Sequence, residues 1–181
     1  GMKGCELFPC PDGAGFRENH LSLVSGVCSF LGLDGPKTLA AAREVAPDIA
    51  DFRIFREGKG MLASAFSANE PESTESLFQS AGWEREETTV LYNSRKDRIA
   101  RLRSFLPWLT GHSWKRVAVT GSRPLFLPSG AEFLSLREPG DLGVFVASEG
   151  KVFGCGNVAG VPLEYLLRRE ERAQGEERIL D

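Results

Sequence analysis

The sequence predicts an α/β fold: a doubly wound, mostly parallel sheet of about six strands with helices on both faces, preceded by a short helical hairpin. From residue 51 onward, short apolar or alternating runs are interleaved with helical segments, which is typical of parallel βαβ units. The stretch 61–78 shows this pattern best, because an apolar small-residue run breaks at Asn69 to Pro71 and restarts as a helix. A strand that turns sharply into a helix is where open α/β sheets place ligand-binding atoms.

The elements of this domain follow from local patterns. Residues 52–56 alternate as a half-buried strand should, and a turn at 58–60 leads into the apolar run. Pro71 suits the first position of a helix over 72–81, and Gly82 suits its end. Later strands are expected at 88–92, 115–120, 131–136 and 151–153, and later helices at 98–109, 141–147 and 161–173. The helix at 98–109 is expected to turn four residues toward the core: Ile99, Leu102, Leu106 and Leu109.

Residues 1–50 are expected to form a separate part of the chain. Residues 1–17 show no periodicity and contain prolines and glycines, so we expect a flexible lead-in. A helix over 18–31 with Asn19 as its N-cap, and a second helix over 36–45, are expected to pair as a hairpin. A hairpin of about 30 residues cannot bury its own apolar face, so we expect it to pack on another element. The sequence therefore predicts two parts, 1–50 and 51–181.

The composition excludes several classes of protein. The 181-residue chain has a net charge of −3 and a pI near 5.6, whereas a nucleic-acid-binding surface needs excess basic charge. No apolar run approaches the ~20 residues of a membrane span, and no signal peptide precedes the fold, so we expect a soluble, cytoplasmic protein. The four cysteines form no C-x-x-C pair and only two histidines are present, so no metal site is expected.

Three expected strand exits carry polar residues from which a ligand site can be built. They are the amide-rich run 64–69, the charged run 93–98 and the glycine-rich run 154–160. Because the carboxyl ends of parallel strands share one edge of a sheet, we expect the three runs on that edge. Two arginines there suit bidentate recognition of a carboxylate, and glycines let the backbone approach a ligand closely.

Each run also has a purely structural interpretation. Asn69 can serve only as a helix cap, the charges at 95–98 can form a solvated ion-pair cluster, and the glycines can form a plain turn. The sequence contains no G-x-x-x-x-G-K-[ST] phosphate loop, no G-x-S-x-G nucleophile and no supported Cys/His nucleophile pair. From the residues alone, the chain is an α/β ligand-binding domain suited to an anionic ligand, and no catalytic residue is assigned.

Five segments, in the same order, resemble one family. Ala63 to Thr74 resembles the Asn-Ala-Phe-Ala-Ala-Asn-Asp-Pro-x-Ser-Thr segment of the ligase subunit of poly-γ-glutamate (capsule) synthase and, more distantly, the Asn-Pro-x-Ser loop of Mur ligases. Asn93 to Arg98 resembles that subunit's Asn-x-Arg-x-Asp-Arg, and Gly154 to Asn157 its Gly-x-Gly-Asn loop. The helix at 18–33 is similar to the one that closes the family's central ATPase domain, and Asp51 to Phe55 sits where Mur ligases carry their Gly-Arg-x-Glu arginine.

The resemblance implies a Rossmann-like C-terminal domain of an ATP-dependent amide ligase at 51–181, with 1–50 as the end of a missing central ATPase domain. In that family, ATP phosphorylates a carboxylate on the central domain, and the amine of an incoming amino acid attacks the acyl phosphate. The C-terminal domain swings in and supplies positioning and charge stabilisation. ATP and Mg²⁺ are therefore the implied cofactors, both bound mainly by the missing domain.

The resemblance also assigns roles by position. Arg53 would reach toward the ATP phosphates, and the nucleotide edge would be lined by Ser64, Ser67 and Asn69. The incoming glutamate-like amino acid would be placed by Asn93, Arg95, Asp97 and Arg98, in a pocket shaped by Gly154, Gly156 and Asn157. The implied partners are this amino acid and the central ATPase domain or subunit of the same ligase. Any association with a membrane would come through partner subunits.

Ser64 departs from the family pattern, because capsule-type enzymes have Asn there and many Mur ligases have Asp. A serine cannot supply that carboxylate, so direct assistance to the chemistry is not expected from this position. Two hypotheses follow. The chain is either the C-terminal domain of a capsule-type or Mur-type ligase, inactive alone, or a non-catalytic α/β module that binds an anionic metabolite or a partner protein. Ser64 favours the second, and the hairpin at 18–46 favours the first.

Overall fold

The computed structural model describes residues 16–46 and 48–180 of the chain. The chain divides into two compact units, Gly1–Pro47 and Asp48–Asp181, and the sequence-based boundary was placed after residue 50. Most of the predicted lead-in, residues 1–15, lies outside the described residues. Residues 16 and 17 already belong to the first helix, so the helix starts earlier than expected.

The first unit contains the predicted helical hairpin, formed by α1 (Phe16–Phe30) and α2 (Gly35–Glu44). Asn19 is not the N-cap of α1, because the helix begins three residues before it. Asp34 caps α2 instead, since its side chain accepts a hydrogen bond from the backbone of Lys37 at 3.0 Å. Several apolar side chains of the hairpin are half exposed or more, among them Leu23, Val27, Phe30, Leu31 and Leu33.

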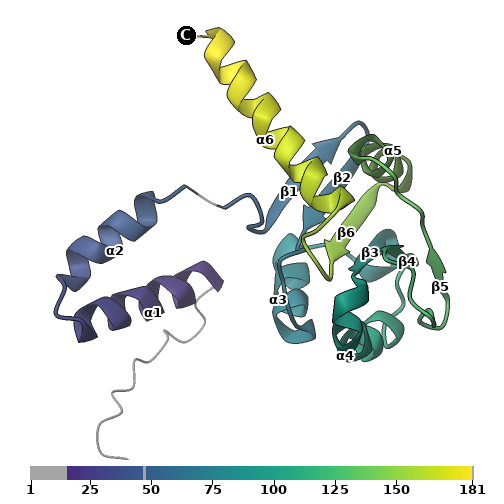
Figure 1. Ribbon diagram of the computed structural model, residues 1–181, viewed down its shortest axis with the longest axis horizontal. Coiled ribbons are helices and arrows are strands. Elements are labelled where there is room, and N and C mark those ends of the chain that lie inside the picture. The colour runs from purple at the N-terminus through teal and green to yellow at the C-terminus, as the bar shows by residue number, and fades with distance from the viewer. Residues whose placement is uncertain (1–15, 47, 181) are drawn as a thin grey trace, which may run out of the picture. The chain divides into compact units, whose positions relative to one another are not determined.

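The second unit is built on one six-stranded sheet with the order β1-β2-β6-β3-β4-β5 (Figure 1). The edge strand β1 runs antiparallel to β2, and all the other pairs are parallel. The mostly parallel α/β fold predicted from the sequence is thereby confirmed. The strands span Arg53–Glu57 (β1), Gly60–Ser64 (β2), Thr88–Ser94 (β3), Arg116–Gly121 (β4), Ala131–Phe133 (β5) and Lys151–Cys155 (β6).

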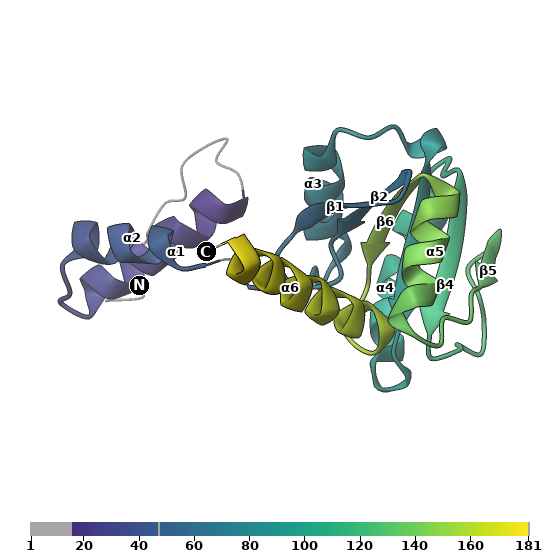
Figure 2. The same cartoon turned by 90° about the horizontal axis from the view of Figure 1, so that it is seen from above.

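Helices cover both faces of this sheet (Figures 1 and 2). One face packs its core against α3 (Pro71–Ala81) and α4 (Ile99–Thr110), and the other against α5 (Pro139–Glu149) and α6 (Val161–Leu180). Two short 3-10 turns, η1 (Arg85–Glu87) and η2 (Lys96–Arg98), precede β3 and α4. All seven residues of β3 are buried, as expected for a strand covered on both faces.

Local chemistry explains where these elements begin and end. Pro71 occupies the first turn of α3, and Gly82 ends it in the left-handed conformation with φ of 65°. The predicted inner face of α4 is only partly right, because Ile99 is 55% exposed. The aromatic rings of Phe105 and Trp108 fill that face instead, together with Leu102 and Leu109, because these larger side chains bury more apolar surface.

Candidate functional site

The three polar strand exits lie at one edge of the sheet. Strands β2, β6 and β3 are parallel neighbours, so their carboxyl ends point the same way. The register places Ser64 beside Gly154 and Tyr92 beside Cys155, so the runs at 64–69, 154–160 and 93–98 leave the sheet next to one another. The neighbouring strand β4 ends at the same edge, where Asn93 pairs in register with Thr120. The topology therefore brings residues from four strands to one edge.

A pair of asparagines joins two of these exits. Asn93 donates from Nδ2 to the main-chain oxygens of Asn157 and Ala159, at 2.7 and 2.9 Å. Asn157 donates from its own Nδ2 back to the main-chain oxygen of Asn93 at 2.8 Å. The two side chains are almost fully buried, so these bonds satisfy groups that water cannot reach. The structure thus brings together two of the predicted substrate-side residues.

Arg101 belongs to the same network, although it was not singled out from the sequence. Its Nη1 donates to the main-chain oxygen of Gly156 at 3.0 Å and to Oδ1 of Asn157 at 2.7 Å. Burial, together with the positive charges of Arg98 and Arg95, lowers the pKa of Arg101. The only local signal is its position on a helix three residues after Arg98, because its partners lie more than 50 positions away in the chain.

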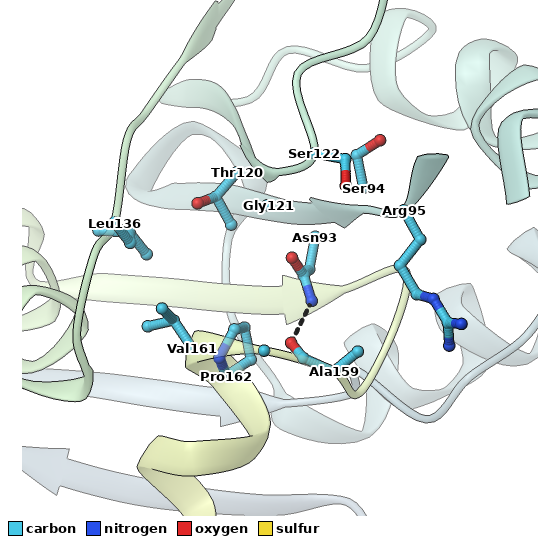
Figure 3. Close-up of a pocket in the computed structure, with 11 residues that line it drawn as sticks. Asn93, Ser94, Arg95, Thr120, Gly121, Ser122, Leu136, Ala159, Val161 and Pro162 are labelled. Carbon is cyan, nitrogen blue, oxygen red and sulfur yellow. Dashed lines mark hydrogen bonds between the residues drawn. The ribbon is translucent and has the colours of Figure 1, made fainter. Parts of the chain in front are cut away.

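A cavity of about 160 Å³ opens beside this network (Figure 3). It lies where β3 and β4 end and α6 begins, so the first turn of α6 forms one wall. The side chain of Thr120 is 1% exposed, and its Oγ1 has no hydrogen-bond partner in the described part of the chain. Neither Thr120 nor Ser122 was predicted from the sequence. The lining residues are Asn93, Ser94, Arg95, Thr120, Gly121, Ser122, Leu136, Ala159, Gly160, Val161 and Pro162.

The segment that follows β3, of which Arg95 lines the cavity, is rich in positive charge. The segment 95–101 contains four basic side chains and one carboxylate, on a chain whose net charge is −3. Arg95 forms a two-point ion pair with Asp97, with Nε to Oδ1 at 3.0 Å and Nη2 to Oδ2 at 2.7 Å. The hydrogen bond from Arg95 lowers the pKa of the Asp97 carboxyl. Arg98 is exposed and has no side-chain hydrogen bond within the described residues.

Both predicted pocket glycines meet a packing requirement. A Cβ on Gly154 would overlap the ring of Phe66, which lies against it. Gly156 has φ of 100°, and a Cβ there would lie 2.8 Å from the main-chain oxygen of Asn93 and 2.9 Å from the ring of Tyr92. Only glycine fits these two positions without a shift of the neighbours. Their effect on the cavity is therefore indirect, through the course of the loop after β6.

The residues predicted for the nucleotide side lie outside the cavity lining. Arg53 donates to the main-chain oxygen of Asp48 at 2.6 Å, and its buried Nε has no hydrogen-bond partner among the described residues. Ser67 donates to the main-chain oxygen of Ala50 at 2.7 Å. Asn69 is exposed and does not cap α3, whose N-cap position is Glu70.

Ser64 is the most deeply buried of the residues predicted for the nucleotide side. It is 1% exposed, and its Oγ has no hydrogen-bond partner among the described residues.

The described residues contain neither a metal-binding cluster nor a membrane-spanning helix. No group of three or more His, Cys, Asp or Glu side chains in the ranges 18–46 and 48–173 is arranged to hold a metal ion. Within the described chain, none of the helices combines the length and apolar character that a bilayer span requires.

The fold matches that of several solved ligases. Folylpolyglutamate synthase from Thermotoga maritima aligns with a TM-score of 0.51 and 17% identity over 86% of this chain and 38% of its own. MurF from Acinetobacter baumannii aligns with a TM-score of 0.52 and 10% identity, over 84% of this chain and 36% of its own. MurF ligase from Thermotoga maritima in complex with ADP aligns with a TM-score of 0.51 and 15% identity, over 89% of this chain and 39% of its own. The chain thus spans less than two fifths of the length of these structures, and it shares its fold with that part of them.

The sequence comparison defines the family. Residues 49–172 match the family described as the poly-gamma-glutamate synthase CapB C-terminal domain, which is more than half of the chain. The chain therefore belongs to the CapB C-terminal domain family, as the resemblance of its five segments predicted. No curated protein sequence matches it.

Proposed function

We propose that this chain is the C-terminal domain of an ATP-dependent ligase and that it places an incoming, glutamate-like amino acid for amide-bond formation. The observation that carries the proposal is the cavity at the carboxyl edge, which is lined by Asn93, by Arg95 and by the first turn of α6 (Figure 3). A guanidinium and the positive end of a helix both stabilise a carboxylate, so an amino-acid carboxylate suits this cavity. Family membership supports the reaction class.

The chain's own contribution to the reaction is positioning. ATP, when held by a central domain, supplies the phosphoryl group that activates a carboxylate toward an amine. No histidine or carboxylate lines the cavity, so its residues supply no general base there. Arg95 and Arg98 instead hold the amino acid through its carboxylates, while Asn93, whose two Nδ2 hydrogens are already donated to the loop, can use its Oδ1 to accept a hydrogen bond from the amine and orient it for attack. Fixing the two reactants in this way removes translational and rotational entropy from the barrier.

The nucleotide side of the proposal rests on Arg53, Ser67 and Asn69. The buried Nε of Arg53, which finds no hydrogen-bond partner in the part of the chain that the structure describes, is a donor that a phosphate oxygen can satisfy, and Asn69 is exposed. We assign the main contacts with ATP and Mg²⁺ to the central domain, since this chain carries no phosphate loop. Because the proposed reaction consumes ATP, we expect the ligase to act in the cytoplasm. Any association with a membrane would come through partner subunits.

Nuclear magnetic resonance of the 15N-labelled chain tests the amino-acid site. We expect L-glutamate to shift the amide signals of residues 93–95, 120–122 and 159–161, and the diamide of glutamate, which lacks both carboxylates, to shift none of them. Adding a central ATPase domain with ATP and an acceptor carboxylate should then give ADP formation that depends on glutamate. Absence of any shift at the cavity would contradict the proposed amino-acid site.

A second candidate is a non-catalytic α/β module that binds an anionic metabolite or a partner protein. Ser64 favours it, because this residue cannot supply a carboxylate and its hydroxyl is buried. Under this hypothesis the chain binds an anion at the same cavity, while ADP formation with the added ATPase domain does not depend on glutamate. The two-component assay therefore separates the two functions.

A further inference from the structure

We infer that Arg101 is a positioning residue: it fixes the loop between β6 and α6, and through Asn157 it fixes the orientation of the Asn93 amide that faces the cavity. The inference rests on the proposed function, because it concerns the site assigned there to the amino acid. Arg101 itself does not line the cavity, so it acts through other residues.

The first step is the contact between α4 and the loop. Arg101 reaches from the first turn of α4 and donates two hydrogen bonds from Nη1, to Gly156 O at 3.0 Å and to Asn157 Oδ1 at 2.7 Å. The two hydrogens of Nη1 lie in the guanidinium plane, so each is directed at one acceptor. The main chain and the side chain of the loop are thereby held together at one point.

The second step is the orientation of the Asn157 amide. With Oδ1 accepting from Arg101, the amide must turn its Nδ2 toward the main-chain oxygen of Asn93, and this bond is 2.8 Å long. The opposite orientation would set Nδ2 against the guanidinium and Oδ1 against a carbonyl oxygen. A cation that cannot accept a hydrogen bond therefore selects one of the two amide orientations.

The third step leads to the cavity. Asn93 donates its Nδ2 to Asn157 O and Ala159 O, so the position of this loop decides where the Asn93 amide lies. Figure 3 shows the amide nitrogen bonded to Ala159 and the amide oxygen turned away from that bond. Ala159 and the next three residues form the wall of the cavity at the start of α6. Arg101 thus controls two walls of a site that it does not touch.

The charge of Arg101 also distinguishes it from an ordinary structural arginine. Its hydrogen-bond partners are a carbonyl and an amide oxygen, and the described residues give it no ion pair with a carboxylate. Burial and the positive charges of Arg98 and Arg95 lower the pKa of Arg101, because both disfavour the charged guanidinium. The charge of Arg101, which Asp97 offsets only in part, adds to the positive potential near the cavity, and a carboxylate ligand would offset it further.

The test compares Arg101→Met and Arg101→Lys with Arg103→Met, an exposed arginine of the same helix outside the cavity lining. For Arg101→Met we expect amide hydrogen exchange of residues 155–160 to speed up about tenfold or more, because charge-assisted hydrogen bonds are lost. The side-chain amide signals of Asn93 and Asn157 should move together. The affinity for L-glutamate should fall about tenfold. In the two-component assay the KM for glutamate should rise while the KM for ATP stays constant.

Arg101→Lys should recover part of both effects, since an ammonium still donates to one acceptor, and Arg103→Met should behave as the parent chain. Loop exchange and amide signals unchanged in Arg101→Met would overturn the inference. So would a loss of glutamate binding with the loop unchanged, because Arg101 would then be a direct ligand. A parent chain that does not bind glutamate would overturn the proposed function, whereas the exchange rates still test the dependence of the loop on Arg101.

Discussion

Asn93 and Asn157 exchange hydrogen bonds across two strand exits: each donates from its side-chain Nδ2 to the main-chain oxygen of the other, at 2.7 and 2.8 Å. The two residues are 64 positions apart in the chain and are 2% and 3% exposed. Because both amides are buried, neither can replace its partner with bulk water. The pair therefore closes the end of β3 onto the loop that leads into α6.

Because Asn93 and Asn157 are each other's hydrogen-bond partners, the effects on stability of substituting the two residues should be strongly coupled. Asn93→Ala and Asn157→Ala should each lower the free energy of unfolding by about 1–3 kcal/mol, because each leaves buried polar groups without partners. The double variant should lose less than the sum, since the second substitution removes groups that the first has already orphaned. Urea unfolding of the four proteins measures the coupling. Additive losses would show that the two side chains do not depend on each other.

Gly154→Ala should destabilise the domain by about 1–3 kcal/mol, because the added methyl group has no room in a packed core. The group that it meets is the ring of Phe66, which fills the space beside Gly154. Combining the change with Phe66→Leu should recover part of the loss, since a smaller side chain vacates that space. Thermal unfolding measures both effects.

Gly140→Ala is the matched control for this prediction. A Cβ at that position would lie 3.6 Å from its nearest neighbour, Oε1 of Glu138, which is ordinary contact. We therefore expect no loss of stability there. Equal losses at both glycines would show that Phe66 is not the cause of the cost at Gly154.

The layout of the fold could be predicted because it depends on local patterns. Short windows of sequence are enough to show the alternation of strands and helices. They also show Pro71 at the start of α3 and Gly82 at its end. The inner face of α4 was partly mispredicted, because Ile99 fits the same helical stripe as Leu102 but the rings of Phe105 and Trp108 take the available space. Which member of a stripe is buried depends on what packs against it.

The candidate site was predictable only in part, for a similar reason. Asn93 and Asn157 stand out because each follows a strand, and the parallel sheet brings such exits together. Arg101 and Thr120 carry no such signal: Arg101 is one of several basic residues near the start of α4, and Thr120 is the penultimate residue of β4. Their importance arises from contacts between segments far apart in the chain, which a local pattern does not contain.

Glu149 should make the stability of the domain sensitive to acid. Burial alone would raise its pKa, but hydrogen bonding from Thr89, at 2.7 Å, and the charges of Arg116 and Lys115 outweigh burial and lower it. A group whose pKa is lower in the folded state stabilises that state above its unfolded pKa and loses this effect as the pH falls through the folded value. We therefore expect a loss of stability below about pH 4.5, the ordinary value for this carboxyl.

Glu149→Gln should remove this part of the pH dependence, because the amide does not titrate. The variant should be less stable than the parent chain at pH 7, and the difference should shrink as the pH falls to 3. Glu86→Gln, at an exposed position, is the control and should leave the profile unchanged. The measurement is the urea midpoint at several pH values. A difference between parent and Glu149→Gln that is constant with pH would contradict the prediction.

The side chains of Arg95 and Arg98 should be needed for ligand binding but not for the stability of the fold. Arg95 lines the cavity and forms an ion pair with Asp97 at the surface, and Arg98 is an exposed residue of the same segment. Surface substitutions of this kind change stability by roughly 0.5 kcal/mol or less, so Arg98→Ala and Arg95→Ala should unfold like the parent chain. Each loses a charged donor for a carboxylate, so each should bind L-glutamate about tenfold more weakly. Arg103→Ala, at an exposed arginine of α4 outside the cavity lining, should bind normally. Unfolded Arg95 or Arg98 variants would show instead that the arginine cluster supports the structure and not the ligand.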